Sequence, residues 1–147
     1  MRWKLLHEHD GQRTFVVVCE TDDEVMELLV AFARQQRLGA SHFTAIGAFR
    51  QATVAYFEWE SKEYRKIAIR EQVEVLSLAG DIALNDGEPQ VHAHVVLGKA
   101  DATAHGGHLF EGVVRPTLEV VLIELPAHLK REFDKDTGLP LINPRAS

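Results

Sequence analysis

Most of the chain between residues 43 and 125 has the pattern of β-strands, and this long run constrains the fold more than any other feature. Segments rich in β-branched and aromatic residues alternate with turn residues such as Gly, Asn and Pro. Because the intervening turns are short, consecutive strands should pair mainly antiparallel. The strands that we expect lie at residues 43–49, 54–60, 64–69, 71–79, 81–84, 90–97 and 117–125.

The start of the chain predicts a β-hairpin. Two apolar segments, Trp3–His9 and Gln12–Cys19, flank the dipeptide Asp10-Gly11. Asp-Gly is a strong signal for a two-residue turn, because both positions of that turn need a positive φ. We therefore expect two paired antiparallel strands here.

A single clear helix is predicted over residues 22–37. Thr21 and Glu24 have the spacing of a capping box, and Gly39 is a natural helix stop. One buried face is formed by Val25, Leu28, Leu29, Phe32 and Ala33. A sheet covered by such a helix predicts an α+β (α/β) fold, with a mainly antiparallel sheet flanked by helices.

Size and composition indicate one globular domain spanning residues 1–147. We place its core at about residues 3–125 and expect residues 126–147 to wrap over the surface as a tail. No apolar run approaches the roughly 18 residues that suggest a membrane-spanning helix. The single cysteine, Cys19, cannot form an internal disulfide, which fits a cytoplasmic location.

The net charge of the chain argues against tight binding of nucleic acid by this chain alone. There are 22 acidic residues against 16 lysines and arginines, giving a net charge of −6. The densest basic stretches are residues 62–70 and Lys130-Arg131. The first is flanked by Glu63 and Glu71, as on an ordinary solvated strand. Because affinity for DNA comes largely from neutralised phosphates, we do not expect this chain alone to bind DNA tightly.

Four of the eight histidines fall within the 17 positions from His92 to His108. His92 and His94 are two apart in a strand-like segment, so both side chains share one face. His108 follows Gly106-Gly107, a pair that allows a positive φ or a close backbone approach. Three neutral imidazoles with an open fourth position form a recurrent zinc arrangement. The spacing of two histidines is by itself a weak signal, because isolated histidines are common.

Other residues near the histidines carry weaker signals. His105 lies in a polar segment, and we interpret it as an exposed loop residue. Ligating histidines usually donate their second N–H to a carboxylate or carbonyl, and Glu111 and Glu119 are the nearest acids in sequence. No spacing identifies a general base, a phosphate-binding loop or a nucleophilic triad. A catalytic metal and a purely structural metal therefore remain alternatives, and an unidentified small-molecule ligand is a third partner to consider.

Taken in order along the chain, these motifs closely resemble the plants and prokaryotes conserved (PPC) domain. The resemblance extends from about Arg13 to Leu125, and its order is more specific than any single motif. Its elements are Ile46-Gly47-Ala48, Tyr64, Leu76-Ser77-Leu78-Ala79-Gly80, His92-Ala93-His94, Gly106-Gly107-His108-Leu109 and Thr117-Leu118-Glu119.

The resemblance implies an α/β or α+β sheet with flanking helices, assembled as a homotrimer. It also implies a divalent metal such as zinc, held by His92, His94 and His108. The chain resembles the stand-alone prokaryotic type, for which no reaction is established. Plant members bind AT-rich DNA through a separate Arg-Gly-Arg-Pro hook, which this sequence lacks. Two functions follow as hypotheses: a trimeric metal-binding protein, or a DNA-associated or regulatory module without its own hook.

Overall fold

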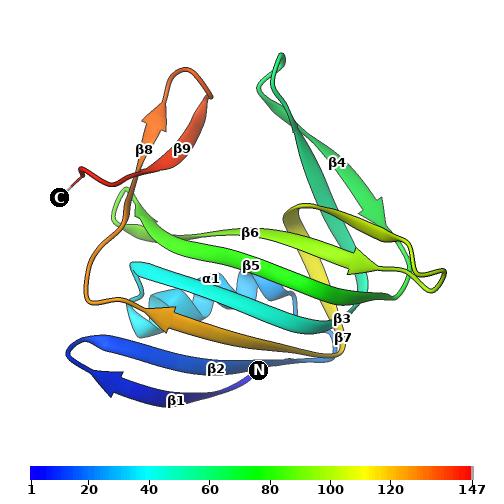
Figure 1. Cartoon of the computed structure of the whole chain (residues 1–147), viewed down its shortest axis with the longest axis horizontal. Helices are drawn as coiled ribbons and strands as arrows, with labels where there is room; N and C mark the ends of the chain where they lie inside the picture. Colours follow the sequence, from blue (N-terminus) through cyan, green and yellow to red (C-terminus); the bar gives the residue numbers. More distant parts are fainter. Residues whose placement is uncertain (147) are drawn as a thin grey trace.

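The computed structural model describes residues 1–146 and is dominated by strands (Figure 1). Strands take up 68% of the residues and helix 8%. Among the described residues, no helix is long and apolar enough to cross a membrane. The elements are β1 (Arg2–His9), β2 (Gln12–Glu20), α1 (Val25–Gln36), β3 (Ala40–Glu58), β4 (Glu63–Ile69), β5 (Val73–Asn85), β6 (Glu88–Gly98), β7 (Ala104–Glu124), β8 (Lys130–Asp134) and β9 (Leu139–Asn143).

The predicted α+β class, with a mainly antiparallel sheet flanked by helices, is wrong. The described chain is predominantly β, with one helix of 12 residues, and the sheet is mixed because β8 runs parallel to β5. Segments that we expected to be separate strands are continuous. Gly80 does not interrupt β5, for example. It lies where a Cβ would come within 2.4 Å of both the Phe43 ring and the carbonyl oxygen of His92, so the close packing requires glycine.

The sheet has the strand order β1-β2-β7-β3-β5-β8-β9, with β4 paired to β3. The strand β6 pairs with β5 along its length and with the beginning of β7. Because β3 also pairs with both β5 and β7, these four strands form a closed ring of pairings. This closure brings residues 92–94 and residue 108 to neighbouring positions.

The N-terminal hairpin is confirmed. Strand β1 pairs antiparallel with β2, and the two turn residues have positive φ angles of 47° at Asp10 and 80° at Gly11. Positive φ at both positions is the requirement that made Asp-Gly a turn signal.

The helix α1 is shorter than predicted at its N-terminus. Glu24, rather than Thr21, is the N-cap, and its carboxylate accepts the backbone N–H groups of Glu27 and Gly112, each at 2.8 Å. The Thr21 hydroxyl donates instead to the carbonyl of Pro116, at 3.1 Å. At the other end, Arg37 adopts the left-handed conformation that we expected Gly39 to provide. Tertiary partners on β7 therefore decide where the helix begins.

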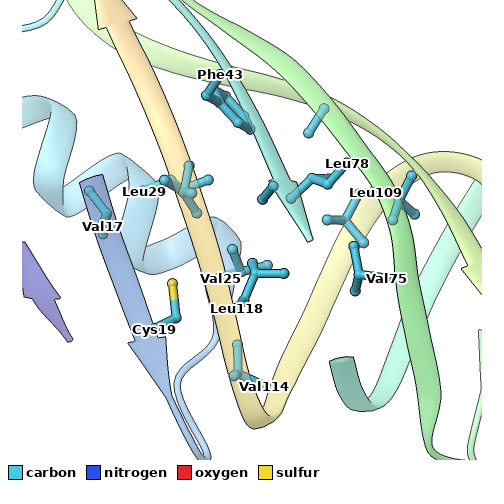
Figure 2. Close-up of a cluster of buried hydrophobic side chains, with 14 of the residues drawn as sticks. Val17, Cys19, Val25, Leu29, Phe43, Val75, Leu78, Leu109, Val114 and Leu118 are labelled. Carbon is cyan, nitrogen blue, oxygen red and sulfur yellow. The ribbon is translucent and has the colours of Figure 1, made fainter. Parts of the chain in front are cut away.

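The core lies between α1 and the inner face of the sheet. Figure 2 shows Val25 and Leu29 of the helix beside Leu118 of β7, with Val17 on the neighbouring β2. On β6, Ala93, Val95 and Leu97 are buried, which confirms that His92 and His94 share the opposite face. Their burial directs His92 and His94 to the outer face.

The expected C-terminal tail contains a hairpin formed by β8 and β9. It is attached to β5 by a hydrogen bond from the Leu84 N–H to the Leu129 carbonyl, at 2.7 Å. In Figure 1 this hairpin and the β3–β4 hairpin both project upward from the sheet, with β6 between their bases. The two projections are the walls of the cleft described below.

Candidate metal centre

The structure brings His92, His94 and His108 together on the outer face of the sheet. His94 on β6 is the direct register partner of His108 on β7. One ring nitrogen from each of the three lies within 4.8 Å of the other two. The ring centroids are separated by 5.1 Å for His92 and His94, 5.1 Å for His92 and His108, and 5.4 Å for His94 and His108.

Two glycines allow β7 to deliver His108 to this position. A Cβ on Gly107 would lie 2.6 Å from the carbonyl oxygen of Ala55, and one on Gly106 would lie 2.7 Å from that of Val95. Both contacts are too short for any side chain. Of the two roles considered for this glycine pair, the structure therefore supports close backbone approach to β3 and β6.

Burial favours the neutral form of His94 and His108, the form that a metal needs. Burial, together with the charges of His92 and His94, lowers the pKa of His108 from 6.5 to about 4. Burial, and then the charge of His92, also lowers the pKa of His94. Because a metal binds the unprotonated imidazole, both residues keep a lone pair for coordination at neutral pH. In addition, the Nδ1 atom of His108 is buried and has no hydrogen-bond partner among the described residues.

Asp81 is the carboxylate that contacts the cluster. Its Oδ2 lies 3.4 Å from Nδ1 of His92, and its Oδ1 accepts a hydrogen bond from the guanidinium of Arg131. The Arg131 side chain is only 6% exposed and also donates to the carbonyl of Pro140, at 3.3 Å. With a proton on Nδ1 facing Asp81, His92 has Nε2 free as a ligand atom.

The other polar residues considered from the sequence lie elsewhere. Glu111 accepts a hydrogen bond from the Thr53 hydroxyl at 3.3 Å. Glu119 is exposed on the outer sheet face, paired in register with Ile46. His105 is exposed as expected but lies in strand β7 rather than in a loop, and its ring nitrogen is 3.4 Å from the Thr103 hydroxyl. Choosing the acids nearest to His108 in sequence therefore missed Asp81, which lies on the adjacent strand β5.

The three histidines form part of a cleft of about 370 Å³. Phe57 and Tyr64 of the β3–β4 hairpin line one side of it, and Leu139–Leu141 of β9 line the other. The Tyr64 ring packs against His108, with 4.8 Å between ring centroids. The cluster thus faces a partly open cleft, and a bound metal would be accessible to a small molecule.

The molecule is a predominantly β domain with three clustered histidines that line a cleft. The sequence profile of the Plants and Prokaryotes Conserved (PCC) domain matches residues 6–126. The chain therefore belongs to this family, the one that the sequence motifs indicated under the abbreviation PPC. No curated protein matches the chain significantly.

Solved structures agree with the family assignment. The metal-containing protein from Archaeoglobus fulgidus is 33% identical, with a TM-score of 0.84 over 97% of this chain and 99% of that one. A plant- and prokaryote-conserved protein from Pyrococcus horikoshii is 30% identical, with a TM-score of 0.84 over 99% and 97% of the two chains. A proposed DNA-binding protein from Ralstonia eutropha is 25% identical, with a TM-score of 0.82 over 88% and 90%.

Proposed function

We propose that this chain binds one zinc ion through His92, His94 and His108. The observation that carries the proposal is the convergence of three ring nitrogens within 4.8 Å of one another. Zinc–nitrogen bonds of 2.0–2.1 Å in a tetrahedral site place the ligand nitrogens about 3.4 Å apart. Small rotations of the histidine side chains would bring the three nitrogens from within 4.8 Å of one another to this shorter spacing. The Archaeoglobus relative, described as a metal-containing protein, is consistent with this proposal.

The donor set favours zinc over harder cations. All three donors are imidazole nitrogens, which suit zinc and neighbouring transition metals, whereas magnesium and calcium prefer carboxylate, carbonyl and water oxygens. A three-histidine site leaves one position open, and zinc in such a site supplies a bound water with a pKa near 7. We assign no reaction, because the one carboxylate that contacts the cluster in residues 1–146, Asp81, is already paired with Arg131.

A homotrimer is the assembly that we propose, as the family resemblance implies. The outer face of the sheet supports a stable interface, because several large apolar side chains on it are exposed in the single chain. They are Ile46 at 63%, Leu76 at 55%, Val121 at 46% and Val96 at 43% exposure. Contiguous exposed apolar surface commonly marks a protein–protein contact.

A DNA-associated role is the alternative, and the name of the Ralstonia relative favours it. The net charge of −6 and the absence of a hook motif in the sequence weigh against DNA binding by this chain alone.

We also propose a reducing, cytoplasmic setting for the protein. It rests on Cys19, a free thiol that is buried in the core, where burial raises its pKa to about 12.

Elemental analysis of the protein purified without a histidine tag tests the zinc proposal. We expect about one zinc per chain in the unaltered protein. His94→Ala should remove it, because two imidazoles hold zinc far more weakly than three, whereas His105→Ala should retain it. Equal zinc loss in both variants would contradict the assignment of the three ligands.

A further inference from the structure

Three buried polar atoms without a hydrogen-bond partner gather around one cleft. They are Oε1 of Gln90, Nδ1 of His108 and Nε of Arg131, and all three residues line the cavity above the histidines. Buried polar groups in folded proteins are almost always paired, so each exception calls for an explanation. A metal would account for the histidine nitrogen if Nδ1 is the ligand atom. The Arg131 Nε–H is a donor without an acceptor, which suggests a bound molecule that accepts a hydrogen bond, whereas Gln90 Oε1 is itself an acceptor and needs a different partner.

The charge of the cleft favours an anion. Arg131 is the one lysine or arginine among the described residues that line it. Two of its nitrogens are engaged with Asp81 and Pro140, which leaves the Nε–H free to donate. The Asp81 carboxylate balances the guanidinium charge, so a divalent metal held by three neutral imidazoles would give the cleft a net positive charge.

The dimensions and walls restrict the anion further. A volume of about 370 Å³ holds roughly a dozen water-sized groups, at about 30 Å³ for each water. Its apolar surface comes from Phe57 on the β3–β4 hairpin, Val91 on β6, and Leu139 and Leu141 on β9. These side chains suit a flat or branched apolar body held between the two projecting hairpins (Figure 1).

We propose that the cleft binds a small organic carboxylate with an apolar body, in contact with Arg131 and the metal. One carboxylate oxygen would take the open metal position, and the other would accept the Arg131 Nε–H. The metal contact rests on the proposed function, whereas the arginine contact does not. A phosphate fits less well, because its additional charge and third oxygen would need further donors, and no lysine or second arginine lines the cleft.

The test is isothermal titration calorimetry of the zinc-loaded protein with phenylacetate, its neutral analogue phenylacetamide, and inorganic phosphate. We expect phenylacetate to bind at least tenfold more tightly than either of the others. Arg131→Lys, which keeps a positive charge for Asp81 but removes Nε, should weaken phenylacetate binding at least tenfold. Arg50→Lys is the control, since Arg50 forms an exposed arginine–carboxylate pair with Asp22 at 2.8 Å and does not line the cleft. It should leave the affinity unchanged.

Gln90→Glu provides a second variant in case Arg131→Lys disturbs the β8–β9 hairpin. A negative charge beside the ligand should abolish phenylacetate binding while zinc content stays at the unaltered level. Repeating the titration after metal removal separates the two proposals. If the metal-free protein binds phenylacetate more weakly than the zinc-loaded protein, and Arg131→Lys abolishes that remaining binding, the result supports the carboxylate site even if zinc does not bind. Equal affinity for phenylacetate and phenylacetamide, or equal affinity in Arg131→Lys and Arg50→Lys, would show that no contact between a carboxylate and Arg131 holds the ligand and would overturn the inference.

Discussion

Replacing Asp81 with Asn should weaken zinc binding without removing any ligand. The Asp81 carboxylate lies 3.4 Å from Nδ1 of His92, where it favours the tautomer that leaves Nε2 free. Loss of such an outer partner typically lowers metal affinity about 10- to 100-fold, or about 1.4–2.8 kcal/mol. The measurement is a competition titration of zinc against a chelating indicator at pH 7.5.

The same substitution should destabilise the metal-free protein. It leaves the Arg131 guanidinium, whose side chain is 6% exposed, without its carboxylate partner. Breaking a fully buried pair costs about 3–5 kcal/mol. We expect about 2 kcal/mol, because the Asp81 side chain is 28% exposed and water can partly solvate the arginine. Guanidinium unfolding in the presence of EDTA separates this loss of stability from the loss of zinc affinity.

Asp22→Asn is the matched control, because it breaks the exposed pair with Arg50, in which the side chains are 64% and 47% exposed. Surface pairs contribute less than about 1 kcal/mol, so stability should change little and zinc affinity should not change. Unaltered zinc affinity in Asp81→Asn would refute the assigned role of Asp81 in orienting His92.

Four further outcomes are expected. The pKa of His108 is lowered from 6.5 to about 4, so the unfolded chain takes up this proton first. The stability of the metal-free protein should therefore fall between pH 6.5 and about 4, and the fall should be smaller in His108→Phe in chemical unfolding at several pH values. Gly107→Ala places a Cβ 2.6 Å from the Ala55 carbonyl oxygen and should cost about 1–3 kcal/mol by overpacking, with a loss of zinc. Light scattering should give about three times the 16.5 kDa chain mass, and Leu76→Asp should lower it. Fluorescence anisotropy with AT-rich and GC-rich duplexes in 0.15 M salt should give dissociation constants no tighter than about 10 μM, and submicromolar binding with a preference would favour the regulatory alternative.

Local sequence signals predicted the N-terminal hairpin and the face of β6 that carries the histidines. The Asp10-Gly11 turn and the alternation of Ala93 and Val95 with the histidines depend only on neighbouring residues. The same kind of signal was available for Asp81. Asn85 and Glu88 pair across the turn between the expected strands 81–84 and 90–97, and counting away from that turn along both strands puts Asp81 opposite His92. The nearest acids in sequence, Glu111 and Glu119, were less informative than strand register.

Long-range contacts account for what the sequence did not predict. Arg131 reaches Asp81 across 50 residues, and nothing near position 131 indicates that contact. The α+β class was wrong because glycines such as Gly80, expected to break strands, instead allow neighbouring strands and rings to pack closely. Residues between the expected strands then became parts of long, continuous ones such as β7. Local patterns do not show whether a glycine ends a strand or permits a close contact, because the partner lies elsewhere in the chain.

The most direct test of the central claim is a crystal structure of the zinc-loaded protein with anomalous data collected at the zinc absorption edge. We predict one anomalous peak per chain, about 2.0–2.1 Å from one ring nitrogen each of His92, His94 and His108, with a fourth ligand facing the cleft. A peak at another group of histidines, or no peak in protein that retains stoichiometric zinc in solution, would contradict the account.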